Sequence, residues 1–185
     1  MARFGFLFAY YAVGMALVPP ISESPEEVRA LLAPLRHPFS IAIHSCQNPF
    51  AVGAIIRVAH SFLAREIIVI GEAPYYPKAS MGMEKYESIV TLPDAPAFFA
   101  RSGERPIYAI EKDAATMAIA DIEAFPKDVV FAFGNEKDGL PAEVLSRATA
   151  VVGIPIYGVN HSLPVVVAAG IVMHEWARRH YRGVR

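Results

Sequence analysis

Short apolar runs alternate with segments of helical periodicity along most of the chain. Each apolar run is closed by polar residues or glycine, and together they predict strands at residues 39–44, 66–70, 89–92, 107–110, 128–133 and 150–156. Apolar positions recurring at helical spacing predict helices at residues 25–32, 52–62, 95–101, 141–148 and 163–181. Strands that alternate with helices indicate an α/β fold, with a mostly parallel sheet and helices on both faces.

The first 36 residues are predicted to extend a single domain. Residues 4–18 are almost wholly apolar, follow Arg3 and end before Pro19 and Pro20. Three interpretations are open: a secretory signal peptide, a strand or helix packed on the core or on a partner subunit, and a misassigned start. The run is shorter than the roughly 20 residues that span a bilayer, so no membrane anchor is expected. We therefore expect an extension at 1–36 and one domain at 37–185.

Composition narrows the class of protein. The chain has 185 residues, of which 54% are hydrophobic and 19% charged, which excludes a disordered chain. The net charge of −1 shows no excess of basic residues of the kind that nucleic-acid-binding proteins carry. Any RNA-binding face is therefore local or shared between subunits. The single cysteine, Cys46, excludes an intrachain disulfide and a cysteine-based zinc site, and it fits a cytoplasmic protein. The histidines lack metal-ligand spacing, so no metal is predicted.

Two polar loops at predicted strand ends are candidates for chemistry. The loop after residue 44 leads into a helix that carries Arg57, which either grips a phosphate or lies on the surface over apolar neighbours. The loop after Phe133 contains Gly134 and Gly139, which permit tight backbone turns and close approach to a ligand. The glycine patterns of dinucleotide-binding and P-loop proteins are absent from the sequence.

A third polar loop joins the last predicted strand to the long closing helix. Ser162 is a candidate helix cap, with Pro164 in the first turn. Backbone N–H groups at this helix start could also bind a ligand carboxylate. Ligands of parallel α/β sheets bind beyond the carboxyl ends of the strands, which is where these loops are predicted.

Three stretches in this order carry a family resemblance. They are GAIIRVAHSF at 53–62, FAFGNEKDGLP at 131–141 and VGIPIYGVNHSLPVVVAAGIVMHEWARR at 152–179. Together they resemble the SPOUT superfamily of RNA methyltransferases, in particular its SpoU/TrmH-like ribose 2′-O-methyltransferases. The resemblance covers about residues 37–182.

The resemblance implies a fold, a cofactor and a partner. The C-terminal part of the α/β domain would form a deep trefoil knot that binds S-adenosylmethionine. Gly134, Asn135, Ile154 and Leu163 occupy the positions implied for cofactor binding. The protein would be a homodimer with its site near the subunit interface. Its implied reaction is methyl transfer to a ribose 2′-hydroxyl of tRNA or rRNA.

The resemblance also implies catalytic residues, whose roles stay open. Arg57 matches the proposed catalytic arginine; a guanidinium is a poor base, so a phosphate clamp that stabilises the developing alkoxide is easier to explain. Glu136 would pair with Arg57 or accept the proton. Ser162 would bind substrate or cofactor. From its residues alone, the stretch around Lys85 mixes aromatic residues with lysine; either Lys85 contacts RNA or the loop packs its own aromatic side chains.

Two positions depart from the family pattern. Ala51 and Pro164 stand where the family has asparagines. One hypothesis is that Asn48 and Asn160 supply replacement amides and bind substrate. The alternative is a homologue that binds RNA, S-adenosylmethionine or both without efficient methyl transfer. A small-molecule enzyme on an ordinary doubly wound sheet remains as a third interpretation if the motif match is a coincidence.

Overall fold

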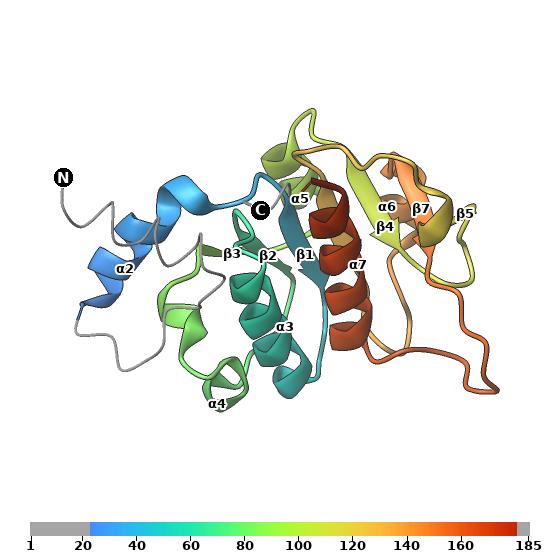
Figure 1. The fold of residues 1–185 in the computed structure, drawn as a ribbon. Helices are drawn as coiled ribbons and strands as arrows, with labels where there is room; N and C mark the ends of the chain where they lie inside the picture. The colour runs from blue at the N-terminus through green and yellow to red at the C-terminus, as the bar shows by residue number, and fades with distance from the viewer. Residues whose placement is uncertain (1–22, 181–185) are drawn as a thin grey trace.

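A seven-stranded sheet forms the centre of the computed structural model, which describes residues 23–180 (Figure 1). The strands are β1 (Ser40–His44), β2 (Ile67–Ile70), β3 (Ile89–Leu92), β4 (Ile107–Ile110), β5 (Met117–Ala118), β6 (Val130–Phe133) and β7 (Ala150–Gly153). They lie in the order β3-β2-β1-β6-β4-β7-β5, and every pairing is parallel. The predicted α/β class and parallel sheet are therefore confirmed.

Helices cover both faces of this sheet. They are α2 (Pro25–Leu32), α3 (Pro49–Ser61), α4 (Pro77–Ser80), α5 (Ala95–Ser102), α6 (Ala142–Arg147) and α7 (Val165–His180), with short 3-10 turns η1 (Ala33–Leu35), η2 (Met83–Lys85) and η3 (Ile119–Asp121). Helices α3 and α7 lie side by side on one face (Figure 1), whereas α5 and α6 pack on the other. Side chains alternate along a strand, so Ile41 and Ile43 pack under α3 and α7 while Ala42 faces α5 and α6.

The C-terminal helix is anchored by a buried tryptophan. Trp176 on α7 packs against Phe39, with 4.6 Å between the ring centroids, and its Nε1 donates to the Pro126 carbonyl at 3.1 Å. A buried tryptophan contributes a large apolar area and places its N–H on a defined partner. This anchor fixes the orientation of α7 and hence the start of the helix at the carboxyl edge of the sheet. Within residues 23–180, no helix is long and apolar enough to cross a membrane.

Two predicted element boundaries are wrong for a local reason. Helix α3 begins at Pro49 instead of residue 52, because the Asn48 side chain accepts hydrogen bonds from the Phe50 and Ala51 N–H groups at 3.1 and 3.4 Å. Helix α7 begins at Val165 instead of residue 163. Ser162 does not cap it, since its hydroxyl makes no hydrogen bond within the described residues.

Other differences reflect tertiary pairing. The strand predicted at 150–156 ends at Gly153, where its ladder with β5 ends. The two-residue strand β5 and the single-turn helix α4 were not predicted. Both are too short to produce a periodic pattern, and their neighbours in the fold decide whether they form.

The described part of the predicted extension is tied to the domain. Val28 and Leu32 of α2 pack against Leu63. The Arg36 guanidinium donates to both carboxylate oxygens of buried Glu87, at 2.7 and 3.0 Å, and to two backbone carbonyls. Residues 23–36 therefore pack on the domain, and the boundary at residue 36 stays a prediction. The apolar segment at 4–18 lies outside the described residues.

Removing the Glu87 carboxylate is expected to destabilise this junction. The Glu87→Ala variant should lower the free energy of unfolding by about 3 kcal/mol, because it leaves the Arg36 guanidinium, whose side chain is 13% exposed, without a counter-charge. Urea unfolding followed by circular dichroism measures the loss. Glu26→Ala, which removes an exposed i,i+3 pair with Arg29, is the matched control and should cost under about 1 kcal/mol. Equal losses in the two variants would contradict the prediction.

Candidate functional site

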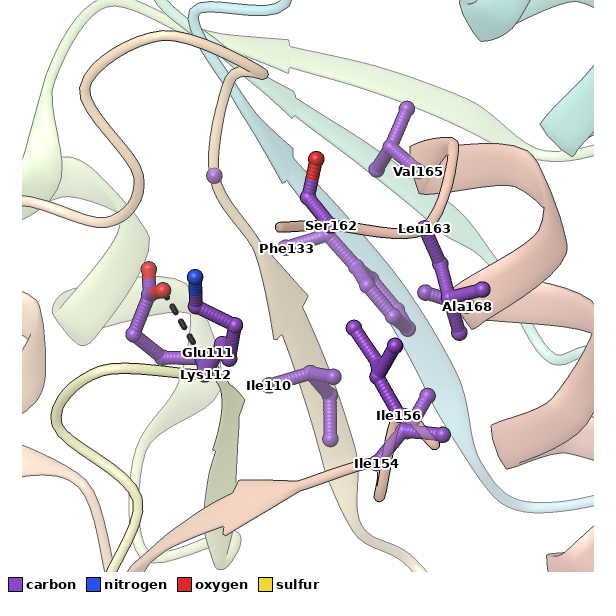
Figure 2. A pocket seen from close by; sticks show the side chains of 11 residues that line it. Ile110, Glu111, Lys112, Phe133, Ile154, Ile156, Ser162, Leu163, Val165 and Ala168 are labelled. Carbon is purple, nitrogen blue, oxygen red and sulfur yellow. Dashed lines mark hydrogen bonds between the residues drawn. The ribbon is translucent and has the colours of Figure 1, made fainter. Parts of the chain in front are cut away.

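A cavity of about 120 Å³ lies at the carboxyl ends of the central strands (Figure 2). Its lining is mostly apolar, with two charged residues and one hydroxyl. The lining residues are Ile110, Glu111, Lys112, Phe133, Gly134, Ile154, Ile156, Ser162, Leu163, Val165 and Ala168. They come from the ends of β4 and β6, the segment after β7 and the start of α7. This is the edge of a parallel sheet at which ligands bind.

The structure brings together three of the four predicted cofactor residues. Gly134, Ile154 and Leu163 all line the cavity, together with Ser162. They meet because β6 and β7 flank β4 in the sheet, and the chain after β7 returns across the strand ends to α7. The fourth, Asn135, does not line the cavity. Its Oδ1 accepts hydrogen bonds from the N–H groups of residues 137 and 138, at 2.9 and 2.6 Å, and so shapes the loop.

The glycines after β6 serve the turn itself. Gly139 has φ +67°, in the left-handed region, and its N–H donates to the Asn135 carbonyl at 3.1 Å. A Cβ on Gly134 would lie closer than 3.0 Å to backbone atoms of Gly139 and Leu140. The loop therefore folds back onto Gly134, and a side chain there would clash with the loop's own backbone.

Glu111 and Lys112, directly after β4, are site residues that the sequence reasoning missed. The Glu111 carboxylate accepts from the Leu140 N–H at 3.2 Å and from the Lys112 N–H at 2.8 Å. The Lys112 ammonium donates to the His161 carbonyl at 2.7 Å and pairs with Asp113 at 3.2 Å. Two adjacent charged residues directly after an apolar strand were the signal in the sequence that could have pointed to them.

Glu136 contacts Cys46, which lies in the loop between β1 and α3. The Cys46 sulfur is 3.6 and 3.8 Å from the two carboxylate oxygens. Burial, reinforced by the neighbouring Glu136 charge, raises the pKa of the Cys46 thiol to about 11. At neutral pH the thiol is therefore protonated and donates to Glu136. The predicted pairing of Glu136 with Arg57 is absent within the described chain.

Arg57 and Lys85 lie on the outer surface. Arg57 is exposed in the third turn of α3, and within residues 23–180 its guanidinium makes no ion pair. Lys85 is exposed at the end of η2, which packs against α3. Neither residue lines the cavity.

The two candidate replacement amides hold backbone in place. The Asn48 oxygen caps α3, and Asn160 Nδ2 donates to the Ser162 carbonyl at 3.1 Å. Asn160 also borders a larger groove of about 640 Å³, which shares Lys112, Ile154 and Ile156 with the cavity. Within residues 23–180, no group of three His, Cys, Asp or Glu side chains is arranged to bind a metal.

Named relatives match over most of the chain. It is 33% identical over 137 residues to a 23S rRNA (adenosine(1067)-2′-O)-methyltransferase of Streptomyces laurentii, which covers 70% of this chain and 50% of that protein. It is 27% identical over 150 residues to a tRNA (guanosine(18)-2′-O)-methyltransferase of Thermus thermophilus, and the match covers 77% of this chain and 76% of that protein. The chain thus spans half the length of the first relative and about three quarters of the second.

A solved structure shares the fold. The S-adenosylmethionine-bound rRNA methyltransferase from Sinorhizobium meliloti superposes with a TM-score of 0.70 and 26% identity, covering 90% of this chain and 62% of that one. The model of the SpoU rRNA methylase family matches residues 38–174, which include all three loops at the carboxyl edge. The chain therefore belongs to the SpoU rRNA methylase family.

Proposed function

We propose that the chain transfers a methyl group from S-adenosylmethionine to a ribose 2′-hydroxyl of tRNA or rRNA. The observation that carries the proposal is the cavity at the carboxyl edge, where Gly134, Ile154 and Leu163 meet in a member of the SpoU family. The names of the relatives support the reaction, and the S-adenosylmethionine-bound neighbour supports the cofactor.

The residues present fit this cofactor. Ile154, Ile156 and Leu163 offer apolar surface to a base, and Ser162 offers a hydroxyl to polar groups of the cofactor. The cavity, at about 120 Å³, is smaller than the roughly 300–1,000 Å³ of typical ligand sites. The adjoining groove of about 640 Å³ supplies the remaining space.

When bound, S-adenosylmethionine supplies a methyl group activated by its sulfonium. The protein then has to position the ribose hydroxyl and remove its proton. Arg57 is proposed to hold an RNA phosphate and stabilise the developing alkoxide. Glu136, held at the edge by Cys46, is proposed as the proton acceptor. The Ser162 hydroxyl lines the cavity and is proposed to contact substrate or cofactor.

A homodimer is part of this proposal. Phe50 on α3 and Val167 on α7 are 60% and 44% exposed, and their helices lie side by side (Figure 1). Large exposed apolar residues on neighbouring helices favour a protein interface. A dimer through this face would bring Arg57, which lines neither cavity nor groove in its own chain, to the site of a second copy.

The trefoil knot, the domain boundary and the location in the cell are also proposals. The return of the chain after β7 across the strand ends, to a helix packed on α3, supports a knotted C-terminal region (Figure 1). The family match starting at residue 38 supports a domain at 37–185 behind an extension at 1–36. RNA substrates and the single thiol, Cys46, support a cytoplasmic protein.

A second candidate is a homologue that binds RNA, S-adenosylmethionine or both without efficient transfer. Ala51 and Pro164 favour it, because neither side chain can donate or accept a hydrogen bond where the family has an asparagine. In addition, the Asn48 oxygen and the Asn160 amide already bind backbone. If these two asparagines nevertheless replace the missing amides, Asn48→Ala and Asn160→Ala should each lower turnover.

One experiment separates the two candidates. Titration calorimetry with S-adenosylmethionine and S-adenosylhomocysteine tests the cavity, with and without RNA. Labelled methyl transfer to bulk tRNA and rRNA, followed by digestion to nucleosides, should then yield a 2′-O-methyl nucleoside. Binding without incorporation would favour the second candidate. The absence of both cofactor and RNA binding would overturn both.

A further inference from the structure

The strand end of β4 reaches two different loops of the cavity. β4 lies between β6 and β7 in the sheet, so the residues that follow it stand between the loops that continue those two strands. Glu111 reaches the loop after β6, and Lys112 reaches the loop after β7. Two consecutive side chains thus contact segments that are far apart in the sequence.

The loop around Gly139 leaves room for the Glu111 carboxylate. Its Oε2 accepts from the Leu140 N–H at 3.2 Å and occupies the space where a Cβ of residue 139 would lie. Only glycine at 139 leaves this room, and its φ of +67° presents the next N–H to the carboxylate. A hydrogen bond to a charged acceptor is stronger than one between neutral groups.

Lys112 makes the main hydrogen bond that holds the exposed loop at residues 157–162. Its Nζ donates to the His161 carbonyl at 2.7 Å, while Tyr157 and Val159 extend into solvent. Within residues 23–180, no other segment donates a hydrogen bond to residues 157–162. Ser162 and Leu163, which line the cavity, follow directly from the tethered residue.

We propose that Glu111 and Lys112 form a latch that positions the two loops of the cavity, each residue holding one loop. Neither is assigned a chemical step; they act through Leu140 and His161. The inference rests on the proposed function only in taking the cavity as the cofactor site. The tethering of the two loops can be measured on the protein alone, without cofactor.

Hydrogen exchange measured by mass spectrometry tests the latch in the full chain without ligand. Glu111→Ala should raise amide exchange roughly tenfold or more in residues 135–140 and leave residues 157–163 near wild type. Lys112→Met should raise amide exchange in residues 157–163 and leave residues 135–140 near wild type. Lys112→Arg retains a donor and should restore protection of the second loop. Lys137→Met, which removes an exposed charge from the first loop, is the matched control and should change neither.

Titration with S-adenosylhomocysteine gives the functional readout. Each latch variant is expected to bind at least tenfold more weakly than wild type, with recovery in Lys112→Arg. Wild-type protein that fails to bind while the exchange pattern holds would support the latch and count against the proposed cofactor. Exchange that rises in both loops for either variant, or in neither, would overturn the latch. Should Glu111→Ala fail to fold, Glu111→Gln, which keeps one acceptor oxygen, should show a smaller rise confined to residues 135–140.

Discussion

Replacing Gly134 by alanine should abolish cofactor binding at concentrations that saturate the wild type. The added Cβ would lie closer than 3.0 Å to the carbonyl carbon and oxygen of Gly139 and to the Leu140 nitrogen. All three are backbone atoms, so no side-chain rotation relieves the clash, and the loop has to move off the cavity. We expect a loss of affinity for S-adenosylmethionine of roughly 100-fold, equivalent to about 2.8 kcal/mol.

Calorimetric titration measures this loss, and Gly103→Ala provides the control. Gly103 also has a positive φ, of 58°, but a Cβ there would meet nothing within 4 Å. Gly103 precedes β4, whereas the cavity lies at the carboxyl end of that strand. Its alanine variant should lose thermal stability from backbone strain and keep wild-type affinity. If Gly134→Ala binds within threefold of wild type, the loop is not part of the cofactor site.

Arg57→Ala should lose methyl transfer while keeping its fold and its cofactor affinity. The side chain is exposed and makes no ion pair within residues 23–180, so its removal leaves no buried partner unsatisfied. If the guanidinium stabilises the developing alkoxide, the single-turnover rate should fall roughly 10²–10³-fold. Arg57→Lys keeps the charge but loses the two-pronged geometry, so it should recover only part of the rate.

The kinetic parameters separate the two contributions proposed for Arg57. A phosphate clamp predicts a higher KM for RNA, with an affinity that depends less on salt than in wild type. Stabilisation of the alkoxide predicts a lower kcat at unchanged KM. Arg65→Ala, which removes an exposed arginine just before β2 at the opposite edge of the sheet, should stay within threefold of wild type. A similar result for Arg57→Ala would make Arg57 a surface residue without a catalytic role.

The sequence alone was sufficient for the fold class and for the family. Apolar runs such as Ile67–Ile70 can only be buried on both faces, which is why they predict parallel strands under helices. The motifs around Gly134, Ile154 and Leu163 revealed the family. A loop whose backbone packs closely and a pocket with an apolar lining each require particular residue types at particular spacings. The start of α3 was also readable in principle, since Asn48 followed by Pro49 is a local capping signal.

The tertiary structure decided which segments meet. Hydrophobic periodicity reports whether a strand is buried, but it carries no information on which strands lie beside it. β4 lies between β6 and β7 only because of the sheet order β3-β2-β1-β6-β4-β7-β5. That order places Glu111 against Leu140 and Lys112 against His161, although 29 and 49 residues separate the partners. Contacts across such separations depend on chain topology, and local residue patterns do not record it.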